Sequence, residues 1–403
     1  MPRRLRAVHH RAAAVLIALA IATPLPLAGG AQNAVDEPGV AIRLAPQHEH
    51  YRPRIEAAAR ESVRWFREWL GSPPPGMAIV DRESSGGPRD AAAIHVTLDL
   101  PWLSTPSSMD VESRVAFGLA RAWWPGWARD PAARPIVDGL AWYLQSRVTA
   151  ELFTVAFGRP GHSADALHYF GGTIPWAVSS LVRGPWTAGL GTDVPPDADR
   201  LTSRMALAFG TIERLVGWPA VEGALTALAP RAIAGGMTPG EVDQVMSSAI
   251  GYPLSWLMEP VRAGRGFDYA IDAVTSVPCD GHPCWRTTVV VAHRGDAAFT
   301  GVRGEPVGSY EQGSVLSVLI RFDDGAVAEA RWDGRTSSRT FVFESARPAA
   351  HVQLDPAGLL LLDRNALDHA WQAVPDTSVP LTKWIAWWLL WMQDAIISHT
   401  AVI

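Results

Sequence analysis

The chain has 403 residues, of which 48% are hydrophobic and 19% are charged, and its formal net charge is -5. A chain of this length can hold two or three domains with separate cores, and its composition excludes a disordered or collagen-like protein. The acidic balance gives no support to nucleic-acid binding, which usually needs a basic surplus. The unusual feature of the composition is its 18 tryptophans.

The first 31 residues are typical of a secretory signal peptide. Four arginines precede an apolar run at residues 12–22, and small residues follow at 28–31. A basic region, a short apolar core and small residues at the cleavage site are the parts of such a signal. The apolar run is short for a membrane span, and a retained anchor is the alternative. We therefore expect an exported protein of the periplasm or cell envelope.

The mature chain begins with a mixture of strands and one helix. Residues 40–44, 77–80 and 94–98 are strand-like, and residues 51–70 predict a helix because apolar side chains recur there at helical spacing. In between, His48, Glu49 and His50 form a sequence that looks like a set of metal ligands. They precede the helix on an irregular segment, so we expect a solvated surface cluster instead. Further helices are predicted at residues 111–124, 135–149, 201–217, 219–228 and 239–250.

The pattern changes to strands after about residue 267. Short runs that alternate or are continuously apolar are separated by Asp-Gly turns, which predicts an antiparallel β-sandwich at residues 267–370. The only two cysteines, Cys279 and Cys284, lie close together across a turn, and in an exported protein this spacing favours a disulfide. The strands are predicted at residues 287–293, 314–322, 326–332 and 340–344.

The C-terminal segment, residues 378–403, predicts a hydrophobic helix. Four tryptophans recur in it at spacings that place them on one helical face, and tryptophan favours the membrane–water interface. Gln393 and Asp394 interrupt the apolar run, which argues against a simple span. We expect a helix that lies on a membrane surface or docks on a partner; a true span and packing on the chain's own core are the alternatives. The tryptophans are Trp384, Trp387, Trp388 and Trp391.

Two stretches resemble a known active site. Residues 115–126 contain a helical pattern that ends in Trp123-Trp124-Pro-Gly, and residues 135–144 contain Asp138-Gly-Leu-Ala. Together they resemble the active-site helices of the gluzincin zinc aminopeptidases, the membrane alanyl aminopeptidase-like family. The resemblance implies an α+β fold: a thermolysin-like domain at residues 38–266, with a short α/β part and a helical part, followed by the β-sandwich and the C-terminal helix.

The residues that carry chemistry in that family are replaced in this chain. Phe117 falls where the family has its first zinc-binding histidine, Gly118 where it has the general-base glutamate, and Arg121 where it has the second histidine. Asp138 stands for the later glutamate ligand, and Thr202 falls near the position of the transition-state tyrosine. A catalytic zinc site needs three protein ligands, and Arg121 adds a positive charge that repels a cation.

Arg121 and Asp138 are expected to face one another where the family's ligands converge. We predict an ion pair between them, because an unpaired buried charge is costly, and on this reasoning Asp138→Asn destabilises the protein. Two separately solvated side chains are the alternative.

These observations favour a non-catalytic, aminopeptidase-like protein of the cell envelope, without a cofactor, that binds peptides or serves as a scaffold for an envelope complex. One alternative is an active metallo-aminopeptidase or hydrolase that holds zinc through other ligands. A second alternative is a purely structural envelope protein. The C-terminal helix makes a membrane surface a further expected partner.

Overall fold

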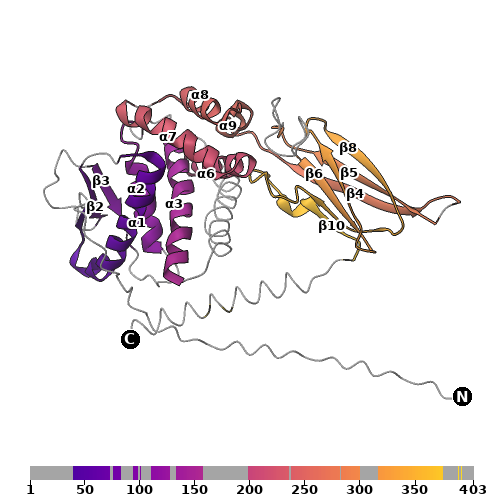
Figure 1. Cartoon of the computed structure of the whole chain (residues 1–403), viewed down its shortest axis with the longest axis horizontal. Helices are drawn as coiled ribbons and strands as arrows, with labels where there is room; N and C mark the ends of the chain where they lie inside the picture. Colours follow the sequence, from indigo (N-terminus) through magenta and orange to yellow (C-terminus); the bar gives the residue numbers. More distant parts are fainter. Residues whose placement is uncertain are drawn as a thin grey trace, which may run out of the picture. The chain divides into compact units, whose positions relative to one another are not determined.

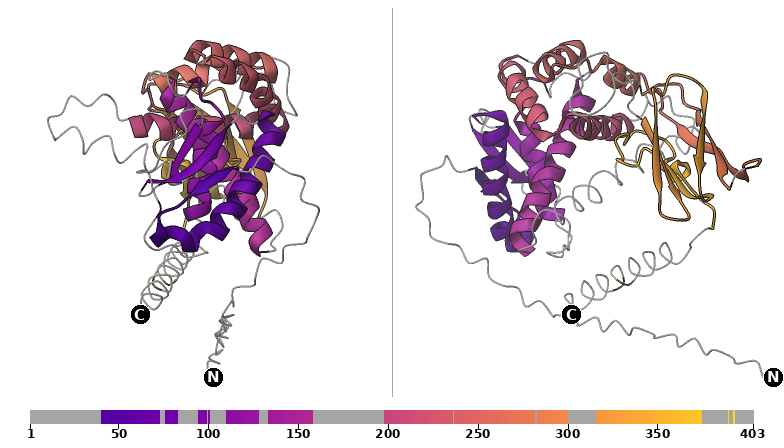
Figure 2. Two further views of the ribbon diagram at one scale, coloured as in Figure 1. Left: turned by 90° about the vertical axis from the view of Figure 1, so that its left-hand side faces the viewer. Right: turned by 45° about the vertical axis from the view of Figure 1, so that its right-hand side comes forward.

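The structure of the protein is a computed structural model, shown in Figures 1 and 2. The predicted signal peptide and the tryptophans of the predicted C-terminal helix lie outside the residues it describes. In the tail it describes only Leu389 and Met392, which are helical and at least half exposed. The remaining described residues are 40–72, 76–82, 94–98, 100, 110–127, 133–157, 198–235, 237–281, 283–299 and 316–374.

A small parallel sheet opens the described chain. Its strands β1 (Ala41–Arg43), β2 (Met77–Asp81) and β3 (Ile94–Leu98) are paired in sequence order. Between β1 and β2 lie a 3-10 helix (Pro46–Tyr51) and helix α1 (Arg52–Leu70). The predicted apolar face of α1 is confirmed as buried, and consists of Ile55, Ala59, Val63, Phe66 and Leu70.

Six helices follow in the described part of the chain. Helix α3 packs against both α2 and α6, and α2 also contacts strand β3. Helix α8 begins with a capping box in which the Thr238 side chain accepts a hydrogen bond from the Glu241 backbone, while the Glu241 carboxylate accepts one from Thr238 N. The helices are α2 (Asp110–Ala122), α3 (Arg134–Phe157), α6 (Ala198–Val216), α7 (Trp218–Ala234), α8 (Pro239–Ile250) and α9 (Ser255–Arg262).

Two helices continue well beyond their predicted ends, and one helix was not predicted. Helix α3 continues two turns beyond the predicted end, to Phe157. Helix α7 continues past Pro230 to Ala234, although a proline inside a helix removes a backbone hydrogen bond and clashes with the preceding turn. Helix α9 was not predicted, since its eight residues are too few to establish a helical period.

Two antiparallel sheets form the last part of the fold, with strand orders β4-β5-β8 and β10-β9-β6-β7. The buried side chains of both, such as Val289, Val318 and Val352, belong to the main hydrophobic core. This agrees with the predicted antiparallel β-rich region, although strands β4, β9 and β10 were not predicted. The bounds are β4 (Tyr269–Pro278), β5 (Trp285–His293), β6 (Leu316–Phe322), β7 (Val327–Trp332), β8 (Ser338–Ser345), β9 (Ala349–Leu354) and β10 (Ala370–Gln372).

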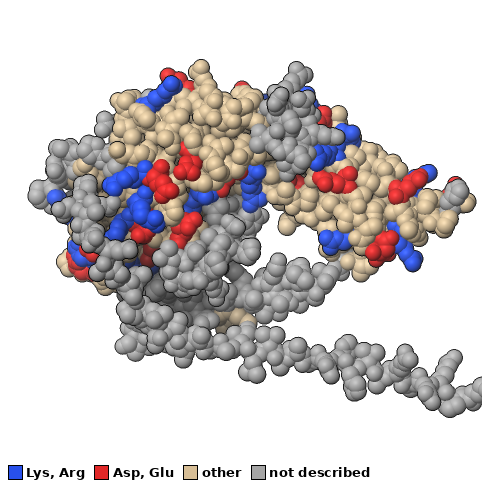
Figure 3. Space-filling model, in the orientation of Figure 1, with Lys and Arg blue, Asp and Glu red and all other residues tan. Residues whose placement is uncertain are grey.

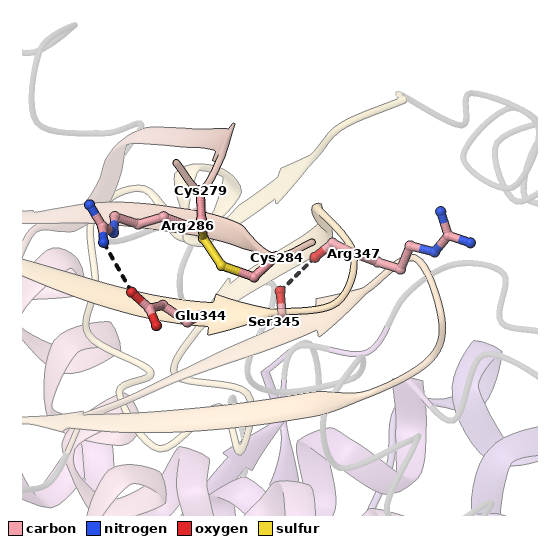
Figure 4. Close-up of a disulfide and its surroundings, with 6 residues drawn as sticks. All are labelled: Cys279, Cys284, Arg286, Glu344, Ser345 and Arg347. Atoms are coloured by element: carbon pink, nitrogen blue, oxygen red, sulfur yellow. Dashed lines mark hydrogen bonds and ion pairs between the residues drawn. A yellow bond between two sulfur atoms is a disulfide. The ribbon is translucent and has the colours of Figure 1, made fainter. Parts of the chain in front are cut away.

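A disulfide closes the turn between β4 and β5 (Figure 4). Cys279 and Cys284 are bonded, with their Cα atoms 5.3 Å apart, and Cys279 N donates a hydrogen bond to Cys284 O at 2.8 Å. Next to the turn, Arg286 on β5 is paired with Glu344 on β8 at 3.1 Å. The covalent link therefore reinforces a hairpin end that its backbone pairing already defines.

The described surface mixes charges of both signs. On the face in Figure 3, basic and acidic side chains lie close to one another, with wide areas of other residues between them. The single lysine, Lys383, lies outside the described residues, so the basic side chains described are arginines. Among the helices that the structure describes, none is both long and apolar enough to cross a membrane.

Candidate functional site

The residues that resemble an active site lie along the contact between α2 and α3. Phe117 and Arg121 are one helical turn apart on α2, and Asp138 and Trp142 are one turn apart on α3. The rings of Phe117 and Trp142 meet edge to face with centroids 6.2 Å apart, and Arg121 meets Asp138. The two helices are therefore antiparallel at this contact. We call these four residues, together with Arg134, the α2–α3 seam.

Asp138 lies between two arginines. Its Oδ1 atom is 2.7 Å from Arg121 Nε, and its Oδ2 atom is 3.5 Å from Arg134 Nε. The Asp138 side chain is 16% exposed, whereas those of Arg121 and Arg134 are 37% and 60% exposed. Both Arg121 Nε and Asp138 Oδ1 are buried atoms without an aligned hydrogen bond. The seam thus contains a close ion pair whose nearest two atoms are buried.

The pKa of Asp138 shows the balance of forces on this carboxyl group. Burial raises its pKa above the ordinary value, and the opposing effect of Arg121 and Arg134 does not cancel the rise. The folded protein therefore binds this proton more tightly than the unfolded chain does. The stabilising contribution of Asp138 is then complete in acid and is lost as the pH rises through the folded pKa.

We predict that Asp138→Asn does not lower the free energy of unfolding at pH 7, because the substitution removes an ionisation that burial disfavours. Arg121 is partly exposed and stays solvated without its partner. The difference from the parent protein should shrink as the pH is lowered from 7, because the Asp138 carboxyl group of the parent then regains its proton. Urea unfolding at pH 7 and in acid measures the difference. A clear loss of stability at pH 7 would show instead that the pair holds the helices together, as the sequence alone suggested.

Gly118 is required by packing between α2 and β3. A Cβ atom at this position would lie 2.3 Å from Val96 Cγ1 and 3.8 Å from Leu98 Cδ2. Val96 is buried and β-branched, so its methyl group has little freedom to move away. A glutamate, the residue that the family resemblance places here, therefore cannot occupy position 118 unless the helix moves away from the sheet.

Thr202 lies beside the turn of α3 that carries Asp138. It is buried in α6, and its carbonyl oxygen would be 2.8 Å from a Cβ atom added at Gly139. The structure therefore brings Thr202 next to the seam through a close approach of two helix backbones. This approach depends on Gly139, which the sequence marked only as a part of the family-like motif.

Trp123 and Trp124 are fully buried at the end of α2. Trp123 packs against the Phe66 ring, with centroids 5.7 Å apart, and Trp124 packs edge to face on Trp127. These tryptophans therefore anchor α2 in the core, and we assign their role to packing.

His48 corrects the expectation of a solvated surface cluster. It is 4% exposed, and its Nδ1 atom lies 2.7 Å from Oδ2 of Asp81, which is fully buried. The same Asp81 oxygen accepts a hydrogen bond from Ala45 N at 3.1 Å. Glu49 is exposed and pairs with Arg52 instead. The sequence could not reveal this dyad, because the parallel pairing of β1 with β2 brings together residues that are distant along the chain.

The residues present do not fit the zinc ion that the family resemblance implies. Phe117 and Gly118 offer no donor side chain, and Arg121 presents a cation beside Asp138, the single carboxylate left. Among the described residues, no group of three or more His, Cys, Asp or Glu side chains is placed to hold a metal ion. We therefore derive no catalytic step through zinc at the seam.

The chain is similar in structure to a solved aminopeptidase. The match is to Legionella pneumophila aminopeptidase A in complex with aspartic acid, at 12% sequence identity and a TM-score of 0.49. It covers 80% of this chain and 35% of that chain, so this chain spans about a third of that protein's length. No protein-family model matches the chain, and no curated protein matches it.

Proposed function

We propose that the protein is a non-catalytic, aminopeptidase-like protein of the cell envelope that binds peptides at the α2–α3 seam. The observation that carries the proposal is the contact of Arg121 with Asp138 at 2.7 Å, at positions where the resembling family converges its ligands. The packing of Gly118 against Val96 supports it, because it leaves no room for a general base. An active site has been replaced by residues suited to hold charged and aromatic groups.

Two features support a binding role over a purely structural one. The seam is only partly buried, and the side chains of Arg121 and Arg134 are 37% and 60% exposed. Half-buried aromatic rings lie next to these charges on the same two helices. A region that served packing alone would gain stability by covering these groups, whereas a binding region needs them accessible.

The proposed location is the periplasm or cell envelope. The signal-like N-terminus supports export, and the disulfide at Cys279–Cys284 suits an oxidising compartment. We also propose that the tryptophan-rich tail holds the protein on a membrane surface or on an envelope partner. Fractionation of the full-length chain and of a chain ending at Pro380 tests the tail; equal solubility would remove the membrane proposal.

The proposed function is tested by measuring peptidase turnover and peptide binding on the same preparation of protein. The mature protein should release no aminomethylcoumarin from alanyl, leucyl or arginyl aminomethylcoumarin, with or without added zinc. The same protein should retain synthetic peptides in equilibrium dialysis. Turnover that tracks zinc would overturn the non-catalytic assignment, and absence of peptide binding would leave only the scaffold role.

A further inference from the structure

The charges of the α2–α3 seam are not balanced. Two guanidinium groups, those of Arg121 and Arg134, share the single carboxylate of Asp138. Among the residues that the structure describes, no second carboxylate forms an ion pair with either arginine. Counted over these described residues alone, the seam has one positive charge in excess with Asp138 ionised, and two when Asp138 is protonated. A partly buried site with this excess attracts an anion.

The donors of the seam are also incompletely used. Elsewhere in the chain, Arg54 holds Glu112 with two aligned hydrogen bonds, from Nε and Nη2, both at 2.7 Å. Arg121 lies equally near Asp138, but neither Arg121 Nε nor Asp138 Oδ1 has an aligned hydrogen bond. A guanidinium satisfies a carboxylate best as a planar fork. A second carboxylate that approaches from solvent can pair with the Arg134 guanidinium, whose side chain is 60% exposed.

The aromatic pair adds a second element of recognition. Phe117 precedes Arg121 by one turn on α2, and Trp142 follows Asp138 by one turn on α3. One turn is about 5.4 Å along a helix. The distance between the rings and the charged groups is therefore similar to the size of a single amino acid. Both rings are only partly buried. An apolar group attached close to a carboxylate can therefore cover them while its carboxylate reaches the arginines.

We propose that the α2–α3 seam binds a carboxylate that has an aromatic group attached beside it, through Arg121 and Arg134 for the charge and Phe117 and Trp142 for the ring. In a peptide, this chemistry is present at a C-terminal phenylalanine or at an acidic side chain next to one. The inference rests on the proposed function and names the class of peptide that the seam selects.

Isothermal titration of the mature protein with small probes tests the inference. N-acetyl-L-phenylalanine supplies the free C-terminal carboxylate, and N-acetyl-glutamyl-phenylalaninamide supplies the acidic side chain. N-acetyl-L-phenylalaninamide lacks the charge, and acetate lacks the ring. We expect at least one of the two charged aromatic probes to bind, and the amide and acetate to bind at least about tenfold more weakly, since each loses one of the two recognition elements.

Three variants tie the binding to the seam. Arg134→Gln should weaken binding of the charged aromatic probe about tenfold, because it removes one charge-assisted contact. Arg64→Gln, at an exposed arginine of α1 that pairs with Glu61, is the matched control and should change nothing. Asp138→Asn should tighten binding several-fold, because it removes the anion that competes for the arginines.

The outcomes separate this inference from the proposed function. If neither charged aromatic probe binds, or if Arg134→Gln and Arg64→Gln weaken binding equally, the carboxylate site is wrong. That result leaves the non-catalytic assignment in place, because it rests on the turnover assay. Binding of only one of the two charged probes supports the site and identifies whether a peptide terminus or an acidic side chain is its source.

Discussion

Gly139→Ala should lower the free energy of unfolding by about 3 kcal/mol, because it forces a methyl group into a close contact between two helices. A Cβ atom at this position would lie 2.5 Å from Met205 Cβ, 2.8 Å from Thr202 O and 3.0 Å from Ala206 N. Two of these atoms belong to the backbone of α6, so no change of side-chain rotamer relieves the clash. The helices α3 and α6 must move apart instead.

A second helical glycine provides the control. Gly223 lies within α7, and a Cβ atom added there would have no heavy atom within 4 Å. Gly223→Ala should therefore stabilise the protein by about 0.5–1 kcal/mol, because alanine is the better helix former. Urea unfolding followed by tryptophan fluorescence compares the two variants. Similar effects at both positions would show that the close approach at Gly139 does not exist in solution.

Glu213→Gln should destabilise the protein by about 2–4 kcal/mol, because it leaves a largely buried cation without its anion. Tyr143 and Arg147 of α3 both contact Glu213 of α6. Glu213 accepts a hydrogen bond of 2.5 Å from Tyr143 Oη and forms an ion pair with Arg147. The side chains of Arg147 and Glu213 are each 19% exposed. Burial, with the Glu213 charge, raises the pKa of Tyr143, so its hydroxyl stays protonated and donates.

An exposed ion pair supplies the comparison for Glu213. Arg286 and Glu344 pair across β5 and β8 at 3.1 Å, with both side chains more than half exposed. Glu344→Gln should therefore cost less than about 1 kcal/mol. Combining Glu213→Gln with Arg147→Met should recover part of the lost stability, because Arg147→Met removes the buried guanidinium that Glu213→Gln leaves unpaired. If Glu213→Gln and Glu344→Gln have the same small effect, the buried network is not a source of stability.

Local sequence patterns were sufficient to predict much of the helical part of the fold. The apolar spacing in α1 correctly identified its buried face, from Ile55 to Leu70. The Asp-Gly pair at Asp324 and Gly325 correctly marked the turn between β6 and β7. These features depend on neighbours along the chain, and for that reason a single sequence reveals them. Strand β10 has three residues, which are too few to give an alternation.

The features of the site that the sequence did not predict depend mainly on contacts between segments that are far apart in the sequence. Gly118 is fixed by Val96 on β3, and Gly139 by the backbone of α6. His48, in the 3-10 helix, meets Asp81 at the end of β2, 33 residues away in the sequence. Arg134 was not among the predicted site residues, although its i, i+4 spacing to Asp138 on α3 indicates that the two side chains can meet. Arg121 and Asp138 do meet, at 2.7 Å, and whether their contact stabilises the protein stays a prediction that Asp138→Asn tests.

The most direct test of the central claim, that the α2–α3 seam is not a metal site, is the zinc content of the purified full-length protein. The protein is incubated with excess zinc, desalted and measured by mass spectrometry of the metal. The account predicts far less than one zinc per chain, and no change on Asp138→Asn. One zinc retained per chain by the parent protein, and lost on Asp138→Asn, would contradict the account.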